Sequence, residues 1–467
     1  MAASLIGRHF FIQSRNRRTL TLKSRLKYSS AVQAVSNEDV ESLYPPVKPR
    51  FPPGNWTSMT EEEAWTRYEA MQEMTAVPTV KERLEKLTKK QMRAYRFPVN
   101  NKSVRVLEFQ KNVTKSHLIK GLPTVYDSLQ VDSLILEKIK PYIIEVLLLE
   151  KERLFRSRFR DIHRDSLILR NLIQTLLPLL YEHNTALRTS QVDEEVDIKG
   201  FWDRSGFKRV MWYDPEMERP KEFRIKYAND VRFQTAHVCD VSIRTENPLK
   251  EFLPIDDELC INEEFPVLEY HPKVFGTSKT DREKSQLTPG YNLGDPCEFG
   301  LVSFHNTVWL DYQRRKYGDA VTEEMRQGMG LTASFTWLLA QAYSQGFNSL
   351  LDVTYPMTTQ TVLSDGQKMS FFAYQLNTID MLKNNMANPR QNICWYTDET
   401  QLYEKIEDGK VIGFNDETCE TLLKFLLMKP ERRNINMKPT LPAESSDILS
   451  ETEFISRNPL DLSTETN

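Results

Sequence analysis

A cysteine, a histidine and an aspartate in one short stretch are the first candidates for chemistry in this sequence. Cys297 and His305 follow Asp295 in a segment rich in Gly, Pro and Ser. A zinc site needs three or four ligands, and a nucleophilic cysteine needs an orienting base that no motif here supplies. The chain also has no CxxC pair, which favours reduced structural thiols over a metal module. We therefore expect no metal ion and no catalytic residue. The cysteines are Cys239, Cys260, Cys297, Cys394 and Cys419.

A glycine-rich stretch over 328–333 matches the letters of the dinucleotide-binding fingerprint. That fingerprint needs a buried strand directly before it, whereas residues 322–327 are charged and have a helical pattern. Gly328 and Gly330 are therefore interpreted as positions of close helix packing. No Walker A, HExxH or GxSxG motif is present, so no cofactor is expected.

Two segments, 151–164 and 202–212, mix cations with aromatic residues. Arg and Lys can neutralise phosphates, and exposed aromatic rings can stack on unpaired bases. The alternative is that the aromatics are core and the cations a solvated surface, since Glu152, Asp161 and Asp203 are interspersed. The candidate nucleic-acid-binding residues are Arg153, Arg156, Arg158, Arg160, Lys208 and Arg209.

The N-terminal segment has the composition of an organellar address. The first 37 residues carry seven Lys or Arg, no Asp or Glu, and interspersed Ser and Thr. This composition is typical of a mitochondrial transit peptide, and the long apolar run of a secretory signal is missing. The alternative is a basic arm that binds RNA directly. We expect a transit peptide over residues 1–30 and a place of action in the mitochondrial matrix.

Removing that leader changes the charge of the chain. The full sequence has 62 basic and 65 acidic residues, a net charge of −3. Without the seven leader cations, 55 basic residues face 65 acidic ones, a net charge of −10. A chain this acidic is not a general polyanion binder, so any contact with RNA must come from local patches of cations.

The apolar periodicity predicts a helical layer over about the first 190 residues, followed by mixed strands and helices. The fold class is therefore α+β, an N-terminal helical region and a mixed strand and helix domain with extended termini. The acidic run 193–197 and residues 276–300 are expected to be loops. No apolar stretch is long enough for a membrane span. Helices are expected over 61–74, 79–95, 132–159, 166–181, 322–345 and 416–428. Strands are expected over 221–227, 231–234, 350–355, 359–363, 369–376 and 392–396. Asp365-Gly366 is expected to form the turn between two of these strands, and residues 371–376 are expected to be covered on both faces of the sheet. Asn415 is expected to cap the start of the last helix.

The same composition shifts divide the chain into five parts. Residues 1–30 are the transit peptide, 31–115 an extended segment with helices, and 116–198 a helical region. Residues 199–433 form the α+β domain, and 434–467 a disordered tail that is polar with few aromatics.

Longer strings in the C-terminal part resemble one known family in order and spacing. The sequence over about 230–430 is similar to the animal mitochondrial ribosomal protein family catalogued as small-subunit protein thirty, also called programmed cell death protein 9. The strings that carry the resemblance include Gln345-Gly346-Phe347, Asp352-Val353-Thr354, Ser370-Phe371-Phe372-Ala373-Tyr374-Gln375, Asn388-Pro389-Arg390-Gln391 and Gly413-Phe414-Asn415-Asp416.

The resemblance implies a non-catalytic structural constituent of the mitochondrial ribosome. Despite the small-subunit name, it implies a place on the large subunit, with the large-subunit rRNA and neighbouring ribosomal proteins, including a related sister protein, as partners. It carries no catalytic residues, metal or cofactor. Two alternatives stay open: a soluble matrix enzyme of unrecognised type, and an apoptosis-linked interaction protein, which the family's second name suggests.

Overall fold

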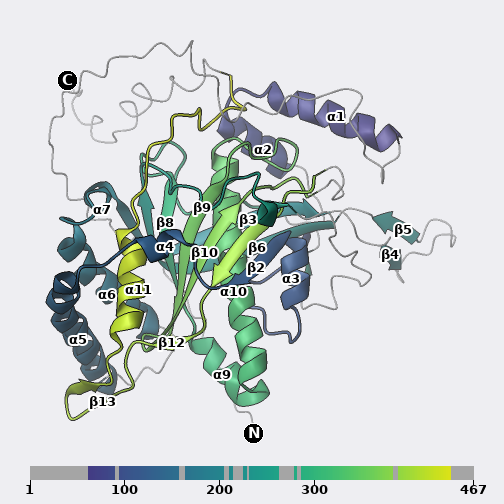
Figure 1. Cartoon of the computed structure of the whole chain (residues 1–467). Coiled ribbons are helices and arrows are strands. Elements are labelled where there is room, and N and C mark those ends of the chain that lie inside the picture. The colour runs from purple at the N-terminus through teal and green to yellow at the C-terminus, as the bar shows by residue number, and fades with distance from the viewer. Residues whose placement is uncertain are drawn as a thin grey trace, which may run out of the picture. The chain divides into compact units, whose positions relative to one another are not determined.

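A mixed sheet organises the chain in the computed structural model (Figure 1). Within the described residues it has ten strands, in the order β2-β11-β10-β9-β8-β6-β1-β7, with β12 beside β10 and β3 beside β6. The pairs β8–β9, β11–β2 and β1–β6 are parallel, and the other pairs are antiparallel. The structure describes residues 61–89, 94–156, 164–204, 210–213, 225–228, 231–261, 278–280, 285–381 and 388–442.

The strands of the large sheet are β1 (Ala94–Arg96), β2 (Ser116–Lys120), β3 (Gln191–Arg204), β6 (Val231–Thr245), β7 (Ser278–Thr280), β8 (Phe299–Asn306), β9 (Met357–Ser364), β10 (Lys368–Leu376), β11 (Asn392–Tyr396) and β12 (Thr400–Gln401). Two small hairpins pair β4 (Val210–Tyr213) with β5 (Ile225–Ala228) and β13 (Lys405–Glu407) with β14 (Lys410–Ile412).

The helices are α1 (Glu61–Thr75), α2 (Val80–Lys89), α3 (Leu107–Val113), α4 (Val125–Ser128), α5 (Ser133–Arg156), α6 (Arg164–Leu180), α7 (Ala186–Thr189), α9 (Val308–Tyr317), α10 (Asp319–Ser344) and α11 (Asp416–Leu427), with a 3-10 turn, η1, at Glu258–Cys260. None of these helices in the described ranges is both long and apolar enough to cross a membrane. Helices and a mixed sheet together confirm the α+β class.

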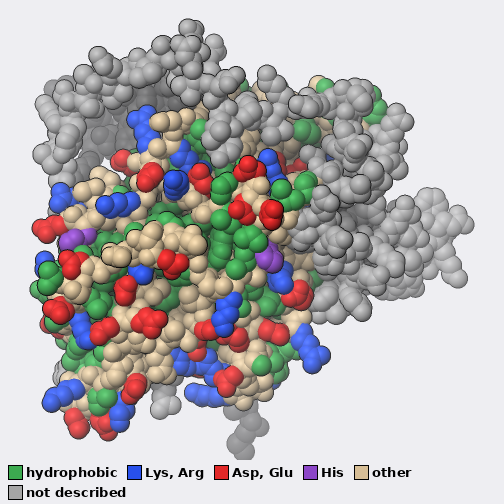
Figure 2. Space-filling view, in the orientation of Figure 1, with side chains coloured by type: hydrophobic (Ala, Val, Ile, Leu, Met, Phe, Trp, Pro, Cys, Tyr) green, Lys and Arg blue, Asp and Glu red, His purple; other side chains and the backbone are tan. Residues whose placement is uncertain are grey.

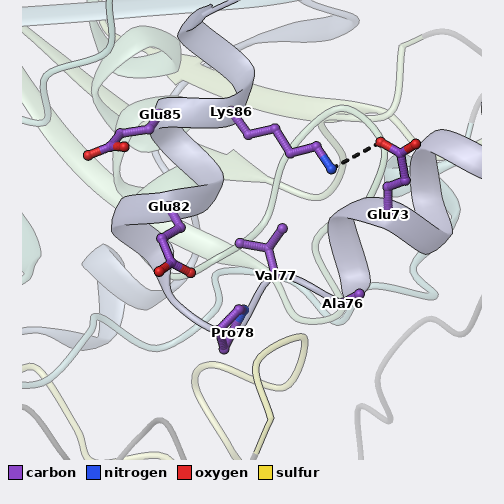
Figure 3. A pocket seen from close by; sticks show the side chains of 7 residues that line it. All are labelled: Glu73, Ala76, Val77, Pro78, Glu82, Glu85 and Lys86. Carbon is purple, nitrogen blue, oxygen red and sulfur yellow. Dashed lines mark ion pairs between the residues drawn. The ribbon is translucent and has the colours of Figure 1, made fainter.

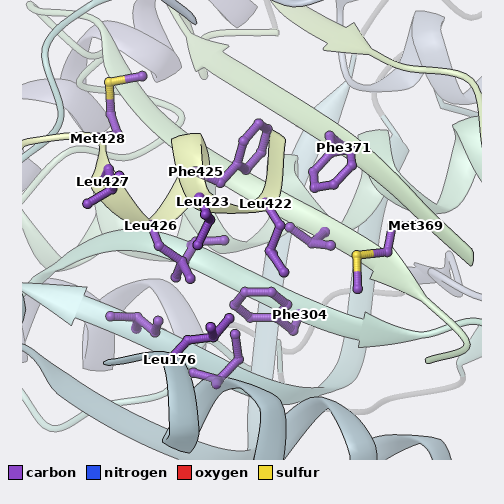
Figure 4. Close-up of a cluster of buried hydrophobic side chains, with 14 of the residues drawn as sticks. Leu176, Phe304, Met369, Phe371, Leu422, Leu423, Phe425, Leu426, Leu427 and Met428 are labelled. Carbon is purple, nitrogen blue, oxygen red and sulfur yellow. The ribbon is translucent and has the colours of Figure 1, made fainter. Parts of the chain in front are cut away.

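Strand β10 shows how the sheet separates two apolar layers. Phe371 and Ala373 pack on one face with α5, α6 and α11, whereas Phe372 and Tyr374 pack on the other with α10. This follows from the two-residue period of a strand, because successive side chains point to opposite faces. In Figure 4 the apolar side of α11 lies over the sheet residues Phe304 and Phe371. Both faces of β10 are buried, as its unbroken run of apolar and small residues predicts.

The turn between β9 and β10 confirms a sequence prediction. The Asp365 carboxylate accepts hydrogen bonds from the backbone N–H of Gln367 at 2.9 Å and of Lys368 at 2.6 Å. Gly366 has a φ of +87°, a conformation that glycine adopts without strain. The strands expected over 359–363, 369–376 and 392–396 are present as β9, β10 and β11.

The glycines of the false dinucleotide fingerprint lie inside α10, as expected for close packing. A Cβ at Gly330 would overlap the ring of Phe372, and one at Gly328 would overlap the side chain of Gln110. Gly330 therefore lets α10 approach β10 until ring and backbone are in contact. No buried strand precedes the two glycines, because α10 is already helical from Asp319.

Several elements expected from the sequence differ from those in the structure. The differences arise from pairing with residues far away in the chain. The helix expected over 79–95 ends at Lys89, and Ala94 begins β1, which pairs with β6 in parallel. Strand β2 also lies in the stretch expected to be helical. Both strands are short and acquire their hydrogen bonds from segments far along the chain, so local periodicity does not show them.

The acidic run 193–197 is a strand and not a loop. It belongs to β3 and pairs with β6, and its charges are matched by distant arginines. Asp193 lies 2.8 Å from Arg244, and Glu194 lies 2.9 Å from Arg170. Residues 350–355 form no strand, because the Asn348 carboxamide folds the chain back by accepting from the N–H of Leu350 and Leu351. The expected loop 276–300 contains β7 and the start of β8.

Candidate nucleic-acid interface

Half of the first basic segment, 151–164, lies outside the described residues, which stop at 156 and resume at 164. Arg153 and Arg156 belong to the last turns of α5, and the positions of their side chains are not described. Arg158 and Arg160 fall in 157–163, and Lys208 and Arg209 in 205–209, outside the described residues. These six residues therefore stay sequence predictions.

The start of the second segment belongs to the core. Trp202 is fully buried, and its indole N–H donates to the Val113 carbonyl at 2.8 Å. The Arg204 guanidinium is also buried and donates to the Asn112 carbonyl at 3.2 Å. Burial lowers the pKa of Arg204 to about 10, because the charged form loses water. Trp202 and Arg204 are therefore core residues and not a nucleic-acid contact, because neither side chain can reach a nucleic acid.

Other buried arginines also hold the fold together. Arg232 forms a bidentate pair with Asp203, with both distances at 2.7 Å. Arg244 joins β6 to Asp193 and Asp295 and lies 4.7 Å from the centre of the Tyr291 ring. These guanidinium groups are already neutralised by carboxylates, so they offer little attraction to a phosphate. Any local attraction for a polyanion must come from cations that are exposed and unpaired.

Three exposed cations lie on two adjoining segments at the end of α11, and we call them the α11-end patch: Lys250, Lys429 and Arg432. None of them forms an ion pair with any described residue. The two segments that carry them touch, because the Glu431 N–H donates to the Pro248 carbonyl at 3.0 Å. Glu431 itself is exposed between the cations and offsets one of their charges. The patch therefore has a surplus of positive charge on exposed side chains.

The patch is held in place by contacts at both of its ends. The Asn184 carboxamide donates to the carbonyls of Leu426 and Met428, each at 3.1 Å, and so fixes the end of α11. The Arg433 guanidinium donates to the Leu249 carbonyl at 2.8 Å, next to Lys250 in the chain. At its other end α11 is capped by Asn415, whose side chain accepts from the N–H of Glu417 and Thr418, as the sequence predicts.

The arrangement suits the sugar-phosphate backbone of a nucleic acid. Exposed Lys and Arg bind phosphates as point charges and hydrogen-bond donors without reading a base. Figure 2 shows Lys and Arg interspersed with Asp and Glu on the visible face, with no broad field of one charge. Attraction of RNA to this surface must therefore be local, as the acidic composition predicts.

The comparison with known families decides the identity of the chain. A model of the family described as mitochondrial 28S ribosomal protein S30 (PDCD9) matches residues 12–430 of the 467-residue sequence. The chain belongs to this family. It is therefore a mitochondrial protein of the ribosomal class, and the resemblance found in the sequence is confirmed.

The α11-end patch was not predicted from this S30-family sequence. Lys250 is far from Lys429 and Arg432 in the chain, and only the fold joins them. A partial signal was present, since 429–433 holds three cations in five residues after the predicted helix. From the sequence alone, this stretch marks only the end of the helix expected over 416–428.

The residues first considered for chemistry have structural partners in this S30-family fold. The buried Cys297 thiol donates to the Thr189 carbonyl at 3.3 Å, and burial raises its pKa. His305 lies 3.2 Å from the Ser303 hydroxyl, and burial lowers its pKa to about 4. Asp295 is paired with Arg244. Within the described ranges, no three His, Cys, Asp or Glu side chains gather as metal ligands would.

A hollow of about 360 Å³ lies at the junction of α1 and α2 (Figure 3). Lys86 reaches across it to Glu73 at 3.0 Å, while Glu82 and Glu85 add negative charge to its rim. A hollow with this balance of charge repels a phosphate. It is therefore not part of the candidate nucleic-acid interface. The lining residues are Glu73, Ala76, Val77, Pro78, Glu82, Glu85 and Lys86.

Proposed function

We propose that this protein is a non-catalytic structural constituent of the mitochondrial ribosome that supports mitochondrial translation. It acts through contacts with neighbouring ribosomal proteins and through a few local contacts with rRNA. The observation that carries the proposal is the family match over residues 12–430. The arrangement of the cations supports it, because the buried Arg232 and Arg244 are neutralised by carboxylates while the α11-end patch is exposed and forms no ion pair with a described residue.

The rRNA contact would rest on two sets of cations. The first is the α11-end patch, and the second is the set predicted from the sequence, which are Arg153, Arg156, Arg158, Arg160, Lys208 and Arg209. Each phosphate contact releases bound counterions, so affinity falls with salt at a log–log slope of roughly 0.7 to 0.9 per contact. A chain of net charge −10 after loss of the leader gains from such contacts only where they are concentrated.

We propose further that the large subunit is the particle in which this protein resides, beside a related sister protein. The support is the family resemblance given above, which implies this placement. The family description itself carries the 28S small-subunit label. The two subunits can be separated at low magnesium concentration and resolved on a sucrose gradient. Recovery of the protein with the large subunit is the expected result, and recovery with the small subunit would overturn this placement.

The leader belongs to the same proposal, since a ribosomal protein made in the cytosol must be imported. Residues 1–30 carry seven cations and no acid, the composition of a transit peptide. A chain that lacks residues 1–30 should stay in the cytosol when it is expressed in cells. Import of the truncated chain into the matrix at the full-length level would show that the address lies elsewhere.

A further inference from the structure

Helix α9 has one face in the core and one face in solvent. Leu310 and Gln313 are buried, and Trp309 packs against the apolar layer that contains α10. The outer side carries Tyr312, whose exposed fraction is 66%, and Tyr317, the last residue of the helix, is 38% exposed. Tyrosines commonly bury their rings and keep only the hydroxyl in water. Tyr312 instead presents most of its ring to solvent.

Two cations accompany the exposed rings. Arg315 and Lys316 follow Tyr312 by three and four positions, so they lie on the same side of the helix. Both are exposed, and neither forms an ion pair with a described residue. The Lys316 ammonium lies 4.7 Å from the centre of the Tyr317 ring. This contact orients the ammonium without neutralising its charge.

Three acids near this end of the helix gather around Arg314. Arg314 pairs with Asp311 at 3.1 Å, with Asp319 at 3.2 Å and with Glu399 at 2.7 Å. Asp398 is paired with Lys120 at 2.7 Å. Arg314, together with Lys368, which also pairs with Glu399 at 3.7 Å, offsets two of the three carboxylates. Arg315 and Lys316 therefore leave a surplus of one positive charge beside the Tyr312 ring.

The stability of the helix explains the position of the two cations but not that of the exposed Tyr312 ring. Cations in the last turn of a helix interact favourably with its dipole, which accounts for the position of Arg315 and Lys316. It does not account for an aromatic ring that stands in water next to them. Rings beside unpaired cations are the combination that proteins use for unpaired nucleotides, because the ring stacks on a base and the cations meet phosphates.

The helix is presented on a fixed support. The Thr307 N–H donates to the Ser364 carbonyl at 3.1 Å, and the Val308 N–H donates to the Asn306 side chain at 2.7 Å. The Asn306 N–H in turn donates to Asp240 of β6 at 2.7 Å. The start of α9 is thus tied to β9 and β6, so its outer side is preorganised for binding.

We propose that the outer side of α9 binds unpaired ribonucleotides, with the Tyr312 ring stacked on a base and with Arg315 and Lys316 on the flanking phosphates. The proposal deepens the proposed function, and it rests on the part of that function that assigns contacts with rRNA. It differs from the α11-end patch in kind, because the patch has cations without an exposed ring and binds phosphates alone. The α9 surface therefore selects single strands over duplexes.

Fluorescence anisotropy with the purified full-length chain tests this surface. The probes are a labelled 12-nucleotide oligoadenylate and an abasic phosphodiester chain of the same length, which keeps the phosphates and removes the bases. Tyr312→Ala should weaken oligoadenylate binding by about 5- to 150-fold, the measured worth of one stacked base. It should leave binding of the abasic chain unchanged. Tyr312→Phe, which keeps the ring, is the matched control and should bind both probes as the unaltered chain does.

A second variant separates the phosphate contacts from the stacking. The double variant Arg315→Gln with Lys316→Gln should weaken binding of both probes and reduce the log–log salt slope by about 1.4. The melting temperature should stay unchanged in every variant, because the altered side chains are exposed. Loss of binding together with a lowered melting temperature in Tyr312→Ala would mark a role in the fold and overturn the proposal.

Three further results would overturn it. One is the absence of detectable oligoadenylate binding by the unaltered chain, and another is equal binding of oligoadenylate by Tyr312→Ala and the unaltered chain. The third is reduced incorporation of Tyr312→Ala into ribosomal particles with unchanged RNA affinity, which would assign this surface to a protein neighbour. In all these cases the unaltered chain would still sediment with ribosomal particles, so the proposed function would stand. Failure of the unaltered chain to sediment with particles would instead reject the proposed function.

Discussion

The guanidinium of Arg83 in α2 is bonded to Thr440, close to the C-terminal limit of the described chain. Its nitrogens donate to the Thr440 hydroxyl at 2.8 Å and to the Thr440 carbonyl at 2.6 Å. The same group donates to the Gly346 carbonyl at 2.8 Å, in the loop that follows α10. Arg83 is buried, with 1% of its side chain exposed. One residue thus ties a helix near the start of the described chain to the loop after α10 and to residues that follow α11.

Replacing Arg83 should therefore destabilise the protein. Arg83→Ala removes the Arg83 donor of the Thr440 carbonyl and leaves the Gly346 carbonyl with the Thr440 hydroxyl as its donor, and an unsatisfied buried group costs about 1–3 kcal/mol. We expect the free energy of unfolding to fall by about 2–4 kcal/mol, measured by urea denaturation. Arg432→Ala removes an exposed guanidinium of the same size and should change stability by less than about 0.5 kcal/mol. Equal stability of the two variants would show that the Arg83 contacts do not hold the fold.

Gly330 should resist even the smallest substitution. Alanine favours a helix over glycine by about 1 kcal/mol, yet a Cβ at this position would overlap the Phe372 ring. Overpacking a filled core costs about 1–3 kcal/mol, so Gly330→Ala should lower the melting temperature. Pairing it with Phe372→Leu, which removes the ring, should recover part of the loss. A Gly330→Ala chain that melts above the unaltered chain would contradict the close packing of α10 on β10.

The buried histidines should make stability depend on pH. Burial lowers the pKa of His305 to about 4, and His237 lies 5.2 Å from it with its pKa also lowered by burial and by His305. The unfolded chain has the ordinary histidine pKa near 6.5, so it binds a proton at a higher pH than the folded chain does. Stability is therefore complete above about pH 6.5 and falls as the pH drops from there towards 4.

The size of this effect can be measured with one substitution. For His305 the loss between pH 7 and pH 5 should be about 2 kcal/mol. His305→Gln should lack this part of the pH dependence, while His183→Gln, at an exposed position, should keep it. Urea denaturation at a series of pH values gives both curves. Parallel curves for His305→Gln and the unaltered chain would show that His305 is not held in its neutral form.

Charge reversal at the α11-end patch should weaken attachment without unfolding the protein. The variant combines Lys250→Glu, Lys429→Glu and Arg432→Glu, all at exposed positions. Affinity of the isolated chain for rRNA should fall, and the log–log salt slope should shrink by about 2 to 3, at 0.7 to 0.9 per contact. Incorporation into ribosomal particles should fall while the melting temperature stays the same. Both quantities are measured on the same preparation.

Two further sets of charge-reversal variants serve as comparisons for the patch variant. Reversal of Lys81 and Lys410, which are also exposed, should leave the slope unchanged if the effect belongs to the patch. Reversal of the set predicted from sequence tests that set separately; its residues are Arg153, Arg156, Arg158, Arg160, Lys208 and Arg209. Normal particle occupancy in the patch variant would show that the patch does not hold the protein in the particle.

The sequence predicted those parts of the fold in which local pattern and tertiary packing agree. Alternation along β10 and the Asp365-Gly366 turn predicted the hairpin, because both faces of the strand are filled and the turn needs a glycine. Asn415 predicted the start of α11 for a similarly local reason. The short strand β1 could not be seen in this way, since its hydrogen bonds come from β6 and β7.

The candidate site was harder to predict from the sequence, because the sequence does not show which cations are exposed and can therefore bind RNA. Trp202 and Arg204 have the residue types of a nucleic-acid contact, yet both are buried. Lys250 is far from Arg432 in the sequence, and the backbone hydrogen bond from Glu431 to Pro248 brings their segments together. Tyr312 carries no local sign that its ring is exposed; only the packing of Leu310 and Gln313 shows which side of α9 faces inward.

Sedimentation of an unfractionated mitochondrial lysate tests the central claim most directly. The quantity to measure is the fraction of the protein that travels with ribosomal particles on a sucrose gradient, followed by antibody alongside an established ribosomal protein. A structural constituent should be found almost wholly in the particle fractions, and digestion of the rRNA by ribonuclease should move it and the reference protein together to the top of the gradient. Recovery of most of the protein in the soluble fractions of an untreated lysate, with the reference protein still in particles, would contradict the account.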